Sequence, residues 1–190
     1  MLTKLRSKVA RLLTSVSRPL AIAPAWVYTL LALILSLLFL VACSIGLVLI
    51  ALTLLILSSL LDAIDGCVAR IRGEASPRGA LLDSVTDRVI DLVYGLGLLT
   101  LGFSPLIVYL WTTLSIVISY IRSRYESLRP GSTLEGVGLM ERGDRVIAIV
   151  IVLTLLLFIG KNMATLALTI ACVLAGITVV ERFIQAYRRL

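Results

Sequence analysis

Two pairs of aspartates in the middle of the sequence could bind metal ions. They lie in the stretch LDAIDGCVARIRGEASPRGALLDSVTD, residues 61–87. Asp62 and Asp65 are three residues apart, and Asp83 and Asp87 are four apart, so each pair shares one face of a helix. If the two helices pack antiparallel, all four carboxylates can meet. Because anions held so close repel strongly at low dielectric constant, the pattern predicts divalent cations with oxygen ligands, with magnesium as the commonest at phosphate sites and manganese or calcium as alternatives.

Small residues and one arginine surround these aspartates. Gly66 and Ala69 follow the first pair, and Gly79 precedes the second. Small side chains let a flat, charged ligand approach the backbone, although they are also typical of close helix–helix packing. Arg70 adds a guanidinium group that suits phosphate oxygens. Metal ions, a cation and small residues together indicate a diphosphate substrate and metal-assisted phosphoryl transfer, with one aspartate also serving as a base.

The helices that carry these residues belong to an integral membrane protein. Of the 190 residues, 59% are hydrophobic and 15% are charged, and the mean hydropathy is +1.07, whereas soluble domains carry about 25% charged residues. A spanning helix needs about 20 apolar residues. We therefore expect an all-α integral membrane domain over residues 19–190. Its six transmembrane helices are predicted at residues 20–41, 44–61, 80–101, 105–123, 146–159 and 163–183.

Residues 1–18 form a separate segment that is basic and amphipathic. Its apolar residues recur at helical spacing, and its lysines and arginines lie mostly on other faces. It lacks the uninterrupted apolar core and small-residue cleavage site of a signal peptide. The pattern predicts an N-terminal amphipathic helix that lies in the membrane interface next to the first span. A basic tail that only sets the orientation is the alternative.

Charge is confined to one side of the predicted bundle. With six spans, 17 of the 18 lysines and arginines lie on the side of the two termini, with Lys161 on the other side, and all 11 acidic residues fall toward the first side. By the positive-inside rule this side is cytoplasmic, which predicts a multi-pass protein of a prokaryotic plasma membrane whose active site faces the cytoplasm. The net charge of +7 then indicates anionic membrane lipids or phosphorylated substrates rather than nucleic acid.

The aspartate stretch resembles the signature of a known family. It reads DAIDGCVAR, then eight residues, then GALLDSVTD. This matches, without a gap or mismatch, the pattern DxxDGxxAR-(x8)-GxxxDxxxD of the CDP-alcohol phosphotransferase family. Eight specified residues at fixed spacing seldom arise by chance, and the six-helix layout predicted above also agrees with the family.

This resemblance implies an activity and a role for each residue of the signature. Members cleave the diphosphate of a CDP-linked lipid and pass the phosphatidyl-type group to an alcohol, releasing CMP, and they usually form homodimers. The resemblance implies that Asp87 is the base that deprotonates the acceptor hydroxyl. Two divalent metal ions would be held by Asp62, Asp65, Asp83 and Asp87. The CDP pocket would be lined by Gly66, Ala69, Arg70 and Gly79.

One departure from the family precedes the first predicted span. Many members carry a Pro-Asn-x-x-Thr pattern there, whereas this sequence reads PAWVYT from Pro24 to Thr29, without the Asn and with the Thr one place late. This puts in question any contact made by the Asn, but not the aspartate chemistry. Beyond the signature, Asp91 continues the four-residue spacing after Asp87. We expect Asp91 to pair with a neighbouring cation, because charges within the membrane are usually paired.

A second polar cluster bears on the acceptor alcohol. Arg122 and Arg124 end the fourth predicted span, in SYIRSRYE, and Arg142 and Arg145 open the fifth, in GLMERGDR. Guanidinium groups bind phosphate in a bidentate manner, although the positive-inside rule alone also accounts for arginines here. Both stretches resemble the inositol-phosphate-using branch of the family, the phosphatidylinositol phosphate synthases, with Glu141 in the expected Glu position. In that branch these arginines surround the phosphate of the acceptor.

The resemblance thus implies inositol 1-phosphate as the acceptor, and CDP-diacylglycerol or, in an archaeon, CDP-archaeol as the donor. Glycerol 3-phosphate and serine are alternative acceptors, because a basic cluster recognises phosphate but not the ring behind it. A cation transporter is a remote alternative, since acidic residues in membrane helices also mark ion pathways. A transporter would need carboxylates near the membrane midplane, whereas these lie at one edge.

Overall fold

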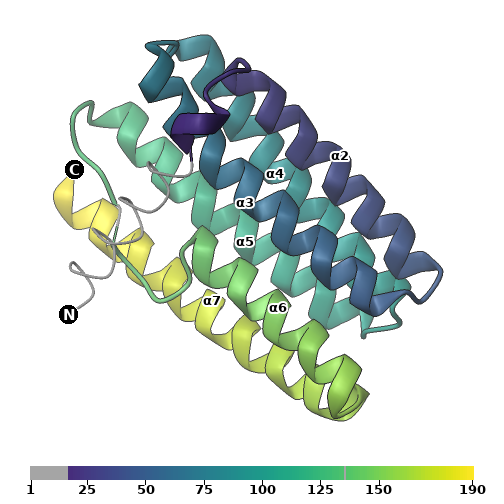
Figure 1. Ribbon diagram of the computed structural model, residues 1–190. Helices are drawn as coiled ribbons and strands as arrows, with labels where there is room; N and C mark the ends of the chain where they lie inside the picture. The colour runs from purple at the N-terminus through teal and green to yellow at the C-terminus, as the bar shows by residue number, and fades with distance from the viewer. Residues whose placement is uncertain (1–16, 135) are drawn as a thin grey trace.

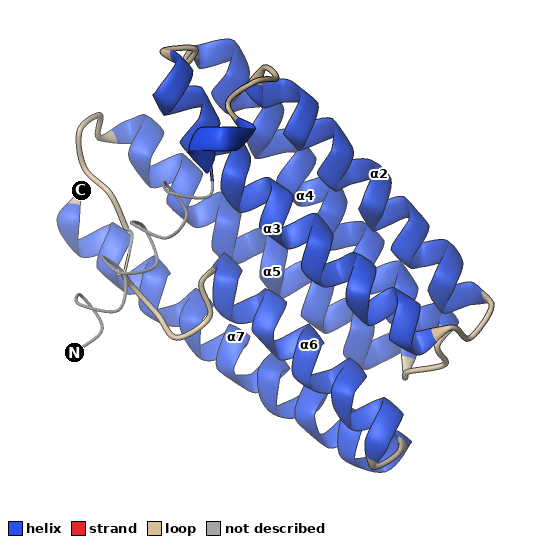
Figure 2. Cartoon of the chain, viewed as in Figure 1, coloured by secondary structure: helices blue, strands red, loops and turns tan. Residues whose placement is uncertain are grey.

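Six long helices make up most of the described chain (Figure 1). The computed structural model describes residues 17–134 and 136–190, so the predicted amphipathic helix over residues 1–18 lies outside the described residues except for its last two. No strand occurs in the described ranges (Figure 2). The helices are α2 (Ala25–Ser44), α3 (Val48–Arg72), α4 (Pro77–Thr100), α5 (Pro105–Leu128), α6 (Arg142–Phe158) and α7 (Lys161–Arg189). The all-helical fold class is therefore confirmed.

Four of the described helices, α2, α3, α5 and α7, are long and apolar enough to cross a membrane. The other two pack against them in the same bundle, α4 against α2 and α5, and α6 against α3 and α7. Helices α4 and α6 do not meet the length and composition expected of a spanning helix, for different reasons. Helix α4 carries the charged residues of the aspartate signature, and α6 is only 17 residues long. The number of spanning helices therefore stays a prediction.

Helices α3 and α4 extend beyond the apolar spans predicted for them. The sequence predicts a long polar connection between residues 70 and 79, but α3 continues to Arg72 and α4 begins at Pro77. Gly73 ends α3 with a φ of 67°, a left-handed conformation that glycine adopts without strain. Ser76 caps α4, because its hydroxyl oxygen accepts a hydrogen bond from the Gly79 N–H at 3.2 Å. Each pair of signature aspartates thus lies on an uninterrupted helix, which fixes the spacing within the pair.

Glycines on α4 allow close packing against α2 and α5. A Cβ atom on Gly97 would lie 2.3 Å from Cε1 of Phe39, on α2, and one on Gly95 would lie 2.3 Å from Oγ1 of Thr112, on α5. The rings of Phe39 and Tyr94 meet edge to face, with centroids 5.2 Å apart. This packing fixes the position of α4, and with it the aspartates that α4 carries.

The two ends of the bundle differ in their connections (Figure 1). At one end, short connections at residues 45–47, 101–104 and 159–160 join the helices. At the other end lie the C-terminus, the α3–α4 loop at residues 73–76, and the longer segment between α5 and α6. The signature aspartates lie toward this second end. Along the outside of the bundle, large apolar side chains such as Leu38 and Leu106 are exposed, as expected for a surface that contacts lipid.

Candidate active site

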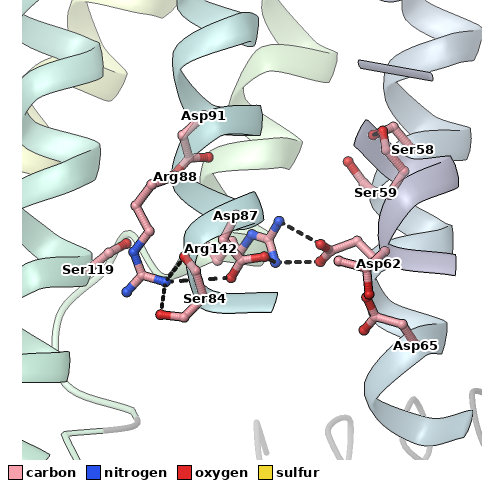
Figure 3. A network of polar contacts seen from close by, with 12 residues as sticks. Ser58, Ser59, Asp62, Asp65, Ser84, Asp87, Arg88, Asp91, Ser119 and Arg142 are labelled. Atoms are coloured by element: carbon pink, nitrogen blue, oxygen red, sulfur yellow. Dashed lines mark hydrogen bonds and ion pairs between the residues drawn. The ribbon is translucent and has the colours of Figure 1, made fainter. Parts of the chain in front are cut away.

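Three of the four predicted metal ligands come together between α3 and α4. One carboxylate oxygen from each of Asp62, Asp83 and Asp87 lies within 4.8 Å of the other two. The short loop at residues 73–76 turns the chain back from α3 to α4, both helices pack against α2, and Figure 3 shows Asp62 on one helix facing Asp87 on the other. Oxygen atoms at this separation form a donor set of the kind that magnesium and manganese prefer. These residues therefore fit a divalent cation.

The fourth aspartate, Asp65, points to a different neighbour. It is 4% exposed, and its Oδ2 accepts a hydrogen bond from Oγ1 of Thr29, on α2, at 2.7 Å. A separation of three residues turns its side chain about 60° away from that of Asp62, which brings it to α2. Sequence reasoning did not assign a role to Thr29, although its displaced position in the PAWVYT stretch was a visible signal. The prediction that all four carboxylates meet thus holds for three of them.

Arg142 lies between the aspartates of the two helices (Figure 3). Its Nη2 donates a hydrogen bond to Oδ1 of Asp62 at 2.9 Å, and its Nη1 donates to Oδ2 of the same carboxylate. Nη1 also lies 2.5 Å from Oδ1 of Asp87. That contact is close enough for an ion pair but lacks the direction of a hydrogen bond, so this buried oxygen has no hydrogen-bond partner among the described residues. The sequence predicts Arg142 as a phosphate ligand, and here it offsets part of the carboxylate charge.

A cavity of about 780 Å³, which we call the first cavity, opens beside Asp65 and Asp83. It is bounded by the start of α2, the end of α3 and the start of α4. A Cβ atom on Gly66 would meet nothing within 4 Å, so the absence of a side chain there leaves open space. The lining includes all the residues predicted for the CDP pocket, namely Gly66, Ala69, Arg70 and Gly79. The predicted set is thus brought together around one cavity.

A second cavity, of about 560 Å³, lies on the other side of the carboxylate cluster. Three of the four predicted acceptor arginines line it, namely Arg122, Arg142 and Arg145. The fourth, Arg124, is exposed and is not on this lining. Asp83 lines both cavities, so the carboxylate cluster lies where the two cavities meet.

Arg145 is buried in the lining of the second cavity and forms an ion pair with Asp91 behind it. Nη2 of Arg145 lies 2.9 Å from Oδ2 of Asp91, and it also donates to Oγ of Ser119 at 3.2 Å. Arg145 is 3% exposed, and its Nε has no hydrogen-bond partner among the described residues. The prediction that Asp91 pairs with a neighbouring cation is confirmed. The ion pair thus holds the Arg145 guanidinium at the cavity, where its Nε–H is available to donate a hydrogen bond.

Arg182, on α7, is a cavity residue that sequence reasoning did not single out. It is 3% exposed and lines the second cavity. Its Nε donates to the carbonyl of Val137 at 2.8 Å, and its Nη2 lies 3.7 Å from Oε1 of Glu141. In the sequence it contributes only to the positive charge of the predicted cytoplasmic side. Its place inside a predicted span was the available signal, because charged residues at membrane depth are usually functional.

Comparison with known proteins agrees with this geometry. Residues 22–180 match the family described as CDP-alcohol phosphatidyltransferase. The archaetidylinositol phosphate synthase of Aeropyrum pernix is 42% identical over 134 residues, which cover 70% of this chain and 68% of that protein. The crystal structure of Mycobacterium tuberculosis phosphatidylinositol phosphate synthase with CDP-DAG bound has a TM-score of 0.77 at 27% identity, covering 93% of this chain and 94% of that one.

The same mycobacterial enzyme in complex with manganese and citrate matches with a TM-score of 0.75 at 25% identity, covering 92% of this chain and 88% of that one. The family match spans most of the chain, including the aspartate signature, the lining of the first cavity, and that of the second cavity except Arg182. The family predicted from the spacing of the aspartates is therefore confirmed, and the chain belongs to the CDP-alcohol phosphatidyltransferase family of enzymes.

Proposed function

We propose that the protein transfers a phosphatidyl-type group from a CDP-linked lipid to a hydroxyl group of inositol 1-phosphate, releasing CMP. The observation that carries this proposal is the meeting of two unlike cavities at Asp83. A diphosphate in the first cavity and a phosphorylated acceptor in the arginine-lined second cavity would approach each other at the carboxylates. The names of the relatives, all inositol phosphate synthases, support this choice of acceptor. Similarity to an archaetidylinositol phosphate synthase supports CDP-archaeol as the donor, with CDP-diacylglycerol as the alternative.

The carboxylates would hold the metal ions. Asp62, Asp83 and Asp87 supply oxygen donors close enough together to share an ion, and Asp65 would complete a second site, as the family signature implies. A bound divalent cation would supply charge neutralisation for the diphosphate. We propose magnesium as the physiological ion, with manganese able to replace it.

Asp87 would act as the base. The acceptor hydroxyl oxygen would form a bond to the lipid-side phosphorus, the bond from that phosphorus to the CMP oxygen would break, and the hydroxyl proton would pass to Asp87. Asp87 lines the second cavity, so its carboxylate is placed on the acceptor side. A positioned base of this kind accelerates proton transfer by about 10²–10⁴-fold.

The arginines would hold the acceptor by its phosphate group. Arg145 and Arg182 are almost fully buried and line the second cavity with Arg122, and charge-assisted hydrogen bonds from guanidinium to phosphate are short and strong. Arg142 would serve both the acceptor and the carboxylates, and Arg124 would contribute from outside the lining.

The membrane setting follows from the same proposal. Helices α2–α7 would all cross the plasma membrane of a prokaryote, with both cavities on the cytoplasmic side, as the charge distribution predicts. The family resemblance also implies that the protein forms a homodimer.

The test is CMP release by the purified protein with Mg²⁺ and either CDP-archaeol or CDP-diacylglycerol. Acceptors to compare are inositol 1-phosphate, free inositol, glycerol 3-phosphate and serine. Release that depends on inositol 1-phosphate is the expected result. Release only with glycerol 3-phosphate or serine would overturn the acceptor assignment but keep the reaction class. No release with any acceptor, with either lipid and with Mg²⁺ or Mn²⁺, would contradict the proposed reaction.

A further inference from the structure

The α3–α4 loop is tied to the segment that precedes α2. Nη1 of Arg72, at the end of α3, donates hydrogen bonds to the carbonyls of Ala21 at 2.8 Å and Ile22 at 3.3 Å. Oε2 of Glu74 accepts a hydrogen bond from the backbone N–H of Ala25 at 3.2 Å. Nε of Arg72 also donates to Oε1 of Glu74 at 2.5 Å. The two side chains thus connect parts of the chain that are about 50 residues apart.

These contacts satisfy backbone groups that have no partner within a helix. Ala25 is the first residue of α2, where N–H groups lack an intrahelical acceptor. The preceding Pro24 makes no side-chain cap hydrogen bond, so Glu74 supplies the acceptor from another part of the chain. A carboxylate at this position is also favoured by the helix dipole. The hydrogen bond from Arg72 lowers the pKa of Glu74 from its ordinary value, which favours the charged carboxylate in this position.

The tied segments form two facing walls of the first cavity. Pro24, Ala25 and Trp26 line it from the α2 side, and Glu74 and Ser76 line it from the loop. Arg72 and Glu74 therefore bridge the walls at their outer end, away from the carboxylate cluster. The bridge thus joins the two walls beside the four-residue loop at residues 73–76, in addition to the packing of α2 against α3 and α4.

We propose that Arg72 and Glu74 are positioning residues that set the width of the first cavity and thereby its affinity for the nucleotide part of the donor. They act through the α2 segment and do not touch the reacting atoms. This inference rests on the proposed function, which assigns the first cavity to the CDP group. The nucleotide, rather than the lipid tails, is the part concerned, because the bridge lies in a polar loop at the end of the bundle.

The test measures CDP binding and kinetics separately. We expect Glu74→Ala to weaken equilibrium binding of CDP, measured by calorimetry without acceptor, by about threefold to thirtyfold. This range is the stability lost with a helix cap, taken as the binding free energy at stake. The KM for the CDP-lipid should rise by a similar factor, while the acceptor KM changes by less than about twofold. Glu74→Gln, which keeps an acceptor oxygen for Ala25, should restore most of the affinity. Because the two residues act as a unit, the double variant with Arg72→Ala should be about as weak as the more affected single variant.

The matched control is Glu181→Ala, which removes an exposed carboxylate on α7 outside both cavity linings and should bind CDP like the wild type. Wild-type affinity in both Glu74→Ala and Arg72→Ala would overturn the positioning role while leaving the donor assignment intact. An equal rise in both KM values would also overturn it, because a general loss of structure affects both substrates. If the wild-type protein itself failed to bind CDP, the assignment of the cavity, and the inference with it, would fall. Thermal unfolding of each variant identifies any that does not fold. If Glu74→Ala does not fold, Arg72→Ala decides the question: a loss of CDP affinity with little change in the acceptor KM supports the positioning role, and wild-type affinity overturns it.

Discussion

The two cavities that meet at Asp83 are constructed in opposite ways. The first exists because side chains are missing, at Gly66 and Gly79, on two helices joined by a short loop. The second is filled with long charged side chains that reach inward from α5, α6 and α7. The small residues of the first would let a ligand approach the backbone beside Arg70, whereas the second would bind its ligand mainly through several guanidinium groups.

This difference has a consequence for how substitutions act. A cavity made by small residues is damaged by adding atoms, and a cavity made by arginines is damaged by removing them. Substitutions that line one cavity should change the KM of one substrate only. Substitutions in the carboxylate cluster between the cavities should instead lower kcat, and they are the first test of this separation.

The largest effect is expected at Asp87, the member of the carboxylate cluster that lines only the second cavity. Asp87→Asn keeps the shape of the side chain but removes a carboxylate that could accept a proton or bind a cation. We expect turnover to fall at least about a hundredfold, within the range for loss of a positioned base, with CDP binding and thermal unfolding close to those of the wild type. Single-turnover CMP release measures the chemical step directly. Turnover like that of the wild type would remove Asp87 from the role of base.

A smaller and more selective effect is expected at Arg182. Arg182→Gln removes a buried cation from the second cavity and should raise the acceptor KM by roughly tenfold to a hundredfold, as expected for hydrogen bonds to a charged group worth about 1.5–3 kcal/mol. The KM for the CDP-lipid should change little. Arg124→Ala is the matched comparison, since Arg124 is exposed and outside the lining, and it should raise the acceptor KM less. If the two variants were equally impaired, the cavity lining would not be what selects the acceptor.

The smallest of these effects is expected from filling the first cavity. Gly66→Leu places a side chain where a Cβ meets nothing within 4 Å, so the helix accepts it and the cavity loses volume. The KM for the CDP-lipid should rise about tenfold, in line with the cost of overpacking, and the acceptor KM should not follow. Gly176→Leu on α7 provides the control, because it also meets nothing within 4 Å and lies on neither cavity lining. Equal donor KM values in the two variants would contradict the shape-based account of this cavity.

The same contrast explains what the sequence could predict. The aspartate signature and the small residues of the first cavity lie within one stretch of 27 residues, 61–87, where the helical repeat fixes which side chains share a face. The second cavity draws on helices that are distant in sequence, and its pairings depend on how those helices pack. Arg142 therefore could be assigned to a phosphate but not to Asp62, and Arg182 was not recognised.

Asp65 shows the same limit within the signature. Spacing correctly placed it on the same helix as Asp62, one turn away. That spacing could not show that Thr29, from a helix earlier in the chain, lies within 2.7 Å of its carboxylate. Helix ends were also misplaced for a physical reason, because hydropathy reports where the apolar stretch stops and not where the backbone hydrogen bonds stop. Helix α3 therefore continues to Arg72, well past the predicted end at residue 61.

Helix α4 sets the spacing of three carboxylates in the site. Its aspartates, Asp83, Asp87 and Asp91, recur every four residues, so they follow one another at steps of about 6 Å along a single rod. Asp83 borders both cavities, Asp87 lines the second cavity, and Asp91 forms an ion pair with Arg145. The spacing of these three carboxylates is thus set by the rise of one helix. Movement of the other helices in the bilayer leaves that spacing unchanged.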